Sequence, residues 1–96
     1  MNENDRPVGP LDLSSIAPDQ ILRRFLVCAL DVHIGGQDAW ERQSKIERLA
    51  VALAMNRADW LQQEGISIAA AIERIGPAWV AHLPLVERQM RALDQS

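Results

Sequence analysis

Residues 18–36 read PDQILRRFLVCALDVHIGG, and apolar side chains recur in this segment at the spacing of one helical face. Pro18 suits the first helical position, because its missing N–H would have no helical partner there in any case. The two glycines at residues 35–36 are expected to end the helix, since glycine adopts the left-handed capping conformation without a side-chain clash. The pattern predicts a helix over residues 18–34 with Ile21, Leu22, Phe25, Leu26, Ala29 and Val32 at its apolar positions.

The next periodic segment predicts one long helix over residues 38–64. Asp38 and Glu41 stand three residues apart, which is close to a capping box at a helix start, and Gly65 is a stop signal. The alternative is a break at Asn56, which could cap a separate short helix. We favour the unbroken helix because no glycine or proline lies around this position. Its apolar stripe contains Ile46, Leu49, Ala50, Leu53, Trp60 and Leu61.

A shorter helix is predicted over residues 67–75, where Ser67 is a suitable N-cap. Gly76 is expected to end this helix, and Pro77 is expected to begin the next helical turn. The inner face of the helix is expected to consist of Ile68, Ala71, Ile72 and Ile75.

Pro84 interrupts the last periodic segment, because a proline removes a backbone hydrogen bond and clashes with the preceding turn. We therefore expect a short turn at residues 77–82 and a final helix at about 84–94. Glu87 and Arg91 form an acid-first pair four residues apart on that helix. No segment alternates apolar and polar residues as a strand would, so the predicted fold class is all-α.

The chain has 96 residues, which is enough for one small core and not for two. We expect a single all-helical domain at residues 18–96, built as a compact bundle of four helices, or of five if the long helix breaks at Asn56. Residues 1–17 are expected to form a flexible N-terminal arm, because Pro7, Gly9 and Pro10 oppose regular structure.

Two apolar runs, at residues 25–30 and 49–55, each extend around the full circumference of a helix. A chain of this size buries only roughly 60–65% of its unfolded surface, so covering two such helices completely is difficult for a monomer. A homodimer would solve this problem by packing the same segments across a two-fold axis. In the alternative, the N-terminal arm and the last helix cover both runs within one chain. The predicted dimer interface consists of Leu22, Phe25, Leu26, Leu49 and Leu53.

The charge balance argues against a protein that works on nucleic acid. Ten basic and thirteen acidic residues give a net charge of −3, and the basic residues are spread along the chain. Nucleic-acid-binding proteins usually concentrate them in a patch or stripe. The composition is better suited to binding a basic or mixed protein surface.

The lack of a recognisable targeting segment and the single cysteine favour a cytoplasmic location. The longest apolar run has seven residues, whereas a membrane-spanning helix needs about 20. The first ten residues lack the apolar core of a secretory signal. Cys28 is the only cysteine, so an internal disulfide is impossible and a reducing compartment is expected.

No catalytic, cofactor or metal site is expected. Cys28, His33 and His82 are too few and too scattered for a zinc site of about four clustered ligands. Cys28 lies in an apolar segment, whereas a reactive thiolate needs an electropositive and partly exposed setting. Neither the dinucleotide fingerprint nor the phosphate-binding loop is present. The sequence therefore does not favour an enzyme.

The hypothesis that fits best is a small acidic helical regulator that binds another protein. It would act as an antagonist of a transcription factor, as an immunity or antitoxin-like partner, or as an accessory subunit. The residues proposed to contact the partner are Trp40, Arg42 and Arg57, because Trp and Arg are enriched at the energetic centres of interfaces.

The alternative hypothesis is a helix-turn-helix regulator that binds DNA through residues 46–64. Ala50 and Ala54 are small where two helices would cross, and Arg57 could contact the duplex. Asp59 and Glu64 would repel its phosphates. A purely structural assembly component is the third possibility.

Overall fold

The computed structural model describes residues 18–95, and this part of the chain contains helices and no strands. The predicted all-α class is confirmed. Six helices follow one another in the order α1 (Pro18–Glu41), α2 (Lys45–Ala54), α3 (Ala58–Gln63), α4 (Ile68–Ile75), α5 (Pro77–Val80) and α6 (Leu83–Gln95). The expected N-terminal arm at residues 1–17 lies outside the described residues.

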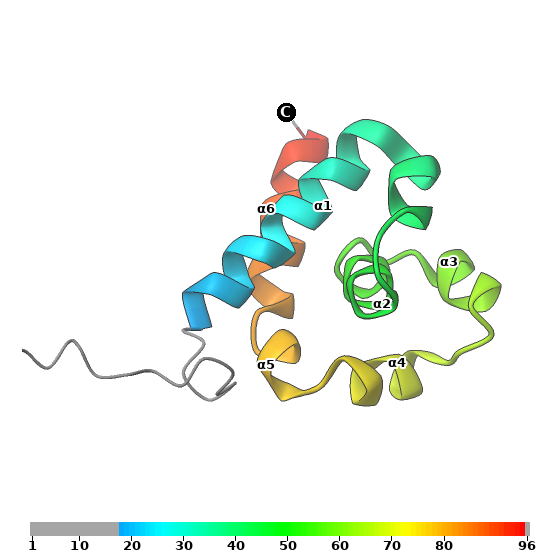
Figure 1. The fold of residues 1–96 in the computed structure, drawn as a ribbon. Helices are drawn as coiled ribbons and strands as arrows, with labels where there is room; N and C mark the ends of the chain where they lie inside the picture. Colours follow the sequence, from blue (N-terminus) through cyan, green and yellow to red (C-terminus); the bar gives the residue numbers. More distant parts are fainter. Residues whose placement is uncertain (1–17, 96) are drawn as a thin grey trace, which may run out of the picture.

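Helix α2 lies at the centre of the bundle. It contacts α1, α3, α4 and α6, and Figure 1 shows it nearly end-on with the other helices arranged around it. Five of its ten residues are buried: Leu49, Ala50, Val51, Ala52 and Ala54. The small alanine side chains allow neighbouring helices to approach closely. The apolar run at residues 49–55 is therefore covered largely within one chain, by α6 as the alternative to a dimer proposed and also by α1, α3 and α4.

The end of the first helix differs from the prediction. Gly36 leaves the helical conformation (φ 70°, ψ −154°), but residues 37–41 form a further helical turn beyond this kink. A side chain on Gly35 would place its Cβ 2.8 Å from the Cβ of Ala39, so both glycines permit the bend. The extra turn buries Ala39 and Trp40 in the core. This burial explains why the chain remains helical past the expected stop.

The predicted single helix over residues 38–64 is wrong. The helix begins after Ser44 and not at Asp38: Ser44 and Glu47 form a reciprocal capping box, in which each backbone N–H donates to the side chain of the other. The helix also breaks at Asn56, as the alternative proposed. Asn56 has φ 59°, a left-handed conformation that asparagine tolerates better than most residues. The N-cap of α3 is Arg57, which makes no side-chain capping bond.

The last part of the chain follows the prediction closely. The Ser67 hydroxyl accepts a hydrogen bond from the backbone N–H of Ala70 at 3.1 Å and so caps α4. The short α5 occupies the expected turn. Pro84 lies in the first turn of α6, where a proline is tolerated. The expected Glu87–Arg91 ion pair is present at 2.7 Å. The described residues thus form six helices, more than expected, because the long helix breaks and α5 is helical.

Two aromatic contacts hold the core between α1 and the rest of the bundle. The rings of Trp40 and Trp60 stack with their centroids 4.8 Å apart, and Phe25 packs against Trp79 at 5.2 Å. The Trp40 indole N–H also donates to the backbone carbonyl of Arg48 at 2.8 Å. The short turn beyond the Gly36 kink is therefore anchored to both α2 and α3.

Candidate protein-binding surface

An apolar groove of about 220 Å³ lies where α2, α3, α4 and α6 meet. Helix α4 contributes two isoleucines that lie four residues apart, and both are exposed in the described structure: Ile68 by 56% and Ile72 by 38%. The aliphatic side chains that line the groove are Leu53, Leu61, Ile68, Ile72 and Leu83.

The exposure of Ile68 and Ile72 corrects the predicted inner face of this helix. Ala71 and Ile75 are buried against the core as expected, but the other two isoleucines face the groove. By helical spacing the four side chains share one face, with Ala71 and Ile75 toward one edge of it and Ile68 and Ile72 toward the other, and the neighbouring helices cover the first edge more completely. The sequence identified this apolar face, but no sequence signal showed that one edge of it would stay open as a groove.

Charged residues of both signs form the polar edge of the groove. The Arg57 guanidinium donates two hydrogen bonds to the Asp59 carboxylate, at 3.0 and 2.8 Å, and lies 4.1 Å from the centroid of the Trp60 ring. The bond from Arg57 lowers the pKa of Asp59, and the same bond raises the pKa of Arg57. Arg57 is thus held in one orientation at the mouth of the groove, with its aliphatic stem available for contact.

A second depression continues the groove along α6. It shares Ala54, Asn56, Arg57 and Glu87 with the first, and it extends over Met90, Arg91 and Asp94. The first depression is mainly apolar, and the second adds Arg91 and Asp94 to the charged residues Arg57 and Glu87 that both depressions share. A protein interface likewise combines an apolar part with a polar part.

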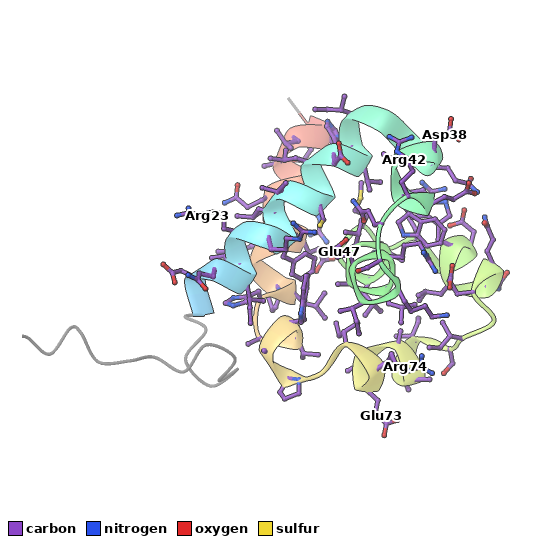
Figure 2. All side chains as sticks on the ribbon, in the orientation of Figure 1. Arg23, Asp38, Arg42, Glu47, Glu73 and Arg74 are labelled. Atoms are coloured by element: carbon purple, nitrogen blue, oxygen red, sulfur yellow. The ribbon has the colours of Figure 1, made fainter. Side chains whose placement is uncertain are left out.

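The three residues predicted to bind a partner do not form one surface. Trp40 is buried in the core, whereas Arg42 is exposed beyond the end of α1 (Figure 2). Arg42 lines another depression, together with Arg24 and Glu47. Arg57 is the predicted residue that lies at the groove. The role of all three in partner binding stays a prediction.

The five residues predicted for a dimer interface are covered, wholly or in part, within one chain. Phe25 and Leu49 are completely buried, and Leu22, Leu26 and Leu53 are half-buried against the core. Phe25 and Leu49 could reach a second copy only if the core opened. The predicted interface itself remains untested.

Cys28 has the environment of a core residue. It is buried in α1, and burial first and the nearby Glu47 second raise the pKa of its thiol to about 11. The thiolate is therefore disfavoured at neutral pH. Within residues 18–95, no group of three or more His, Cys, Asp or Glu side chains is placed to hold a metal ion. No helix in this range has the length and apolar character needed to cross a bilayer.

Residues 46–64 adopt two helices joined by the turn at residues 55–57. The second of these helices, α3, has only six residues, and its Trp60 and Leu61 are buried. Its exposed side chains include Asp59 and two glutamines, and Arg57 is paired with Asp59. The surface that would approach a DNA backbone in the alternative hypothesis therefore carries little available positive charge.

The comparisons with known proteins assign no family. No protein-family model matches the chain, and neither a curated protein nor a solved structure shows significant similarity to it.

Proposed function

We propose that this protein is a small acidic regulator that binds another protein through the groove between α2, α4 and α6. The observation that carries the proposal is the pair of exposed isoleucines, Ile68 and Ile72, in a groove with an aliphatic lining. Contiguous apolar surface with a polar edge marks interaction sites more often than isolated exposed apolar residues do.

The groove fits side chains of a partner protein better than a cofactor. Its volume of about 220 Å³ lies below the range of about 300–1,000 Å³ that is usual for small-molecule pockets. Its elongated continuation along α6 suits an amphipathic helix that inserts a few aliphatic side chains. Arg57, Glu87, Arg91 and Asp94 would then meet polar residues on both sides of that helix.

The proposed roles are those of an antagonist of a transcription factor, an immunity or antitoxin-like partner, or an accessory subunit. In each of them the protein acts in the cytoplasm by occupying a surface and not by catalysis. The proposal also includes self-association as a homodimer.

A pair of matched substitutions tests the groove. Ile72 and Leu93 are exposed to a similar extent, by 38% and 40%, but only Ile72 lines the groove. Tagged wild-type protein, Ile72→Glu and Leu93→Glu are each used to recover bound proteins, which are identified by mass spectrometry. We expect one partner to be recovered in near equal amounts with the wild type and Leu93→Glu and to be lost with Ile72→Glu. Circular dichroism establishes that both variants are folded. Equal recovery with all three proteins contradicts the proposal.

The DNA-binding alternative is supported by one observation, the turn between α2 and α3 in which Asn56 takes the left-handed conformation often filled by glycine. It predicts duplex binding that weakens steeply as salt is raised. Arg57→Ala should then weaken that binding. If the protein does not bind duplex DNA even at low salt, this alternative is wrong.

A further inference from the structure

The outward side of α1 carries a line of uncovered aliphatic residues. Val27, Leu30 and Ile34 are exposed by 56%, 41% and 83%. They are spaced three and four residues apart, and Gln20 and Arg23 continue the same spacing toward the N-terminus. Figure 2 shows the labelled Arg23 pointing away from the body of the bundle. We call these five residues the α1 seam.

The spacing of the α1 seam is that of the a and d positions of a coiled coil, in which such side chains pack between those of a second helix. The seam lies entirely before the Gly36 kink, so its residues share one regular helical segment. The opposite side of this segment is already used, because Phe25, Cys28 and Ala29 are buried in the core. The apolar run at residues 25–30 is thus covered by the chain on its inner side only.

We propose that the α1 seam is the surface through which two copies of this chain associate, with their α1 helices antiparallel. This inference deepens the self-association included above and does not depend on the groove. Arg23 supplies the orientation. In a parallel pair Arg23 would face Arg23 of the partner subunit, whereas in an antiparallel pair it faces Ile34 of the partner subunit and covers it with its aliphatic stem.

The charged residues beside the α1 seam are complementary when the two α1 helices are antiparallel. Arg24 and Asp31 lie seven residues apart, nearly two turns, and therefore flank the seam on one side. When Val27 packs against Leu30 of the partner subunit, Arg24 comes within about 3 Å, along the helix axis, of the level of Asp31 of the partner subunit. The two-fold axis repeats this pair. In each chain Arg24 is already oriented by its ion pair with Glu47 at 2.6 Å.

A second copy of the chain fits the α1 seam because the apolar residues and the two flanking charged residues all lie on the same helix. An interface that is formed by one patch on both subunits must be self-complementary, and the α1 seam with its flanking Arg24 and Asp31 meets that requirement. The apolar contribution of three aliphatic residues from each copy is small beside a standard interface of about 800 Å² per partner. The dimer is therefore expected to dissociate on dilution.

Sedimentation analysis of the full chain over a concentration series measures this association. We expect the wild type to pass from monomer to dimer and Leu30→Glu to weaken dimerisation at least about tenfold, because it places a charge in the apolar seam. Ile68→Glu, in the groove, should dimerise like the wild type. A wild type that stays monomeric at all concentrations overturns the proposal. The α1 seam would then have to contact something other than a second copy, such as residues 1–17. A dimer that is insensitive to Leu30→Glu overturns it as well.

A charge exchange tests the antiparallel orientation. Asp31→Arg alone and Arg24→Glu alone should each dimerise poorly, because like charges then face one another. A mixture of the two variants should form a heterodimer, since each Arg then faces an acidic residue. If Leu30→Glu dissociates the dimer but the mixture does not associate, the antiparallel arrangement is wrong. Loss of partner recovery through the groove has no bearing on either result, so the two proposals fail independently.

Discussion

Trp40 and Trp60 stack on one another in the core and are both almost completely buried, but their indole N–H groups differ. The N–H of Trp40 donates to the Arg48 carbonyl at 2.8 Å. The N–H of Trp60 is buried and has no hydrogen-bond partner among the described residues. Substitution of each tryptophan by phenylalanine therefore isolates the energetic effect of one hydrogen bond.

The expected difference follows from three contributions. Both substitutions replace the same indole by the same phenyl ring, so the loss of apolar contact is similar. Trp40→Phe also loses a hydrogen bond of about 1 kcal/mol, whereas Trp60→Phe removes an unsatisfied donor whose burial costs about 1 kcal/mol or more. Each substitution also weakens the contact of an arginine with the ring, and the closer one, Arg57 at 4.1 Å from Trp60 against Arg48 at 5.9 Å from Trp40, costs Trp60→Phe roughly 0.5 kcal/mol more. Trp40→Phe should thus unfold with a free energy about 1.5 kcal/mol lower than that of Trp60→Phe.

Urea denaturation followed by circular dichroism measures this difference, because the signal does not depend on the tryptophan that has been replaced. For a domain of this size, about 1.5 kcal/mol corresponds to a difference in Tm of roughly 6–12 °C. The variant with both substitutions serves as a control for coupling between the stacked rings. If Trp60→Phe proves as destabilising as Trp40→Phe, the unpaired N–H of Trp60 does not carry the expected free-energy cost.

Three further outcomes are expected. Gly36→Ala should lower the unfolding free energy by about 1–3 kcal/mol in urea denaturation, because φ 70° with ψ −154° is a conformation that only glycine adopts readily; an unchanged midpoint would mean that the kink relaxes. Hydrogen bonds from Lys45, which has the larger effect, and from Arg48 lower the pKa of Glu64. These bonds therefore stabilise the folded state at pH values above the usual glutamate pKa of about 4.3, and this stabilisation is lost as the pH falls through the lowered pKa. Glu64→Gln should therefore cost up to about 1 kcal/mol at pH 7, and this cost should shrink as the pH is lowered below about 4.3; a cost that stays constant into the acid range would refute the assignment. Cys28 should react with an alkylating reagent far more slowly in the native protein than in urea, because burial keeps its thiol protonated; comparable rates would show that α1 opens readily.

Local signals account for much of the fold. Ser67, Gly76 and Pro77 define the boundaries of α4 and α5 because each acts through its own backbone or through a neighbouring N–H. The same local chemistry predicted the Glu87–Arg91 pair. Such effects depend on a few adjacent residues, so they are visible before any tertiary contact is known.

The candidate site could be predicted only in part from local sequence patterns. Arg57 was selected from the sequence and lies at the groove, but Trp40 was selected and is buried in the core. The isoleucines at the centre of the groove were assigned to the inner side of their helix. Helical spacing identifies which residues share a face, but it does not reveal which edge of that face a neighbouring helix covers.

The amino-acid sequence alone determined the all-α class, the start of α1 and the ends of α4 and α6, because these depend on composition and local backbone chemistry. Tertiary packing decided where the long segment breaks. The left-handed conformation of Asn56 costs only a little free energy. In return, the break directs Trp60 and Leu61 back into the core, where Trp60 stacks on Trp40. The burial of two large apolar side chains outweighs the few tenths of a kcal/mol that local propensity contributes at such a position. The same packing surrounds α2 within one chain and leaves the α1 seam and the groove uncovered.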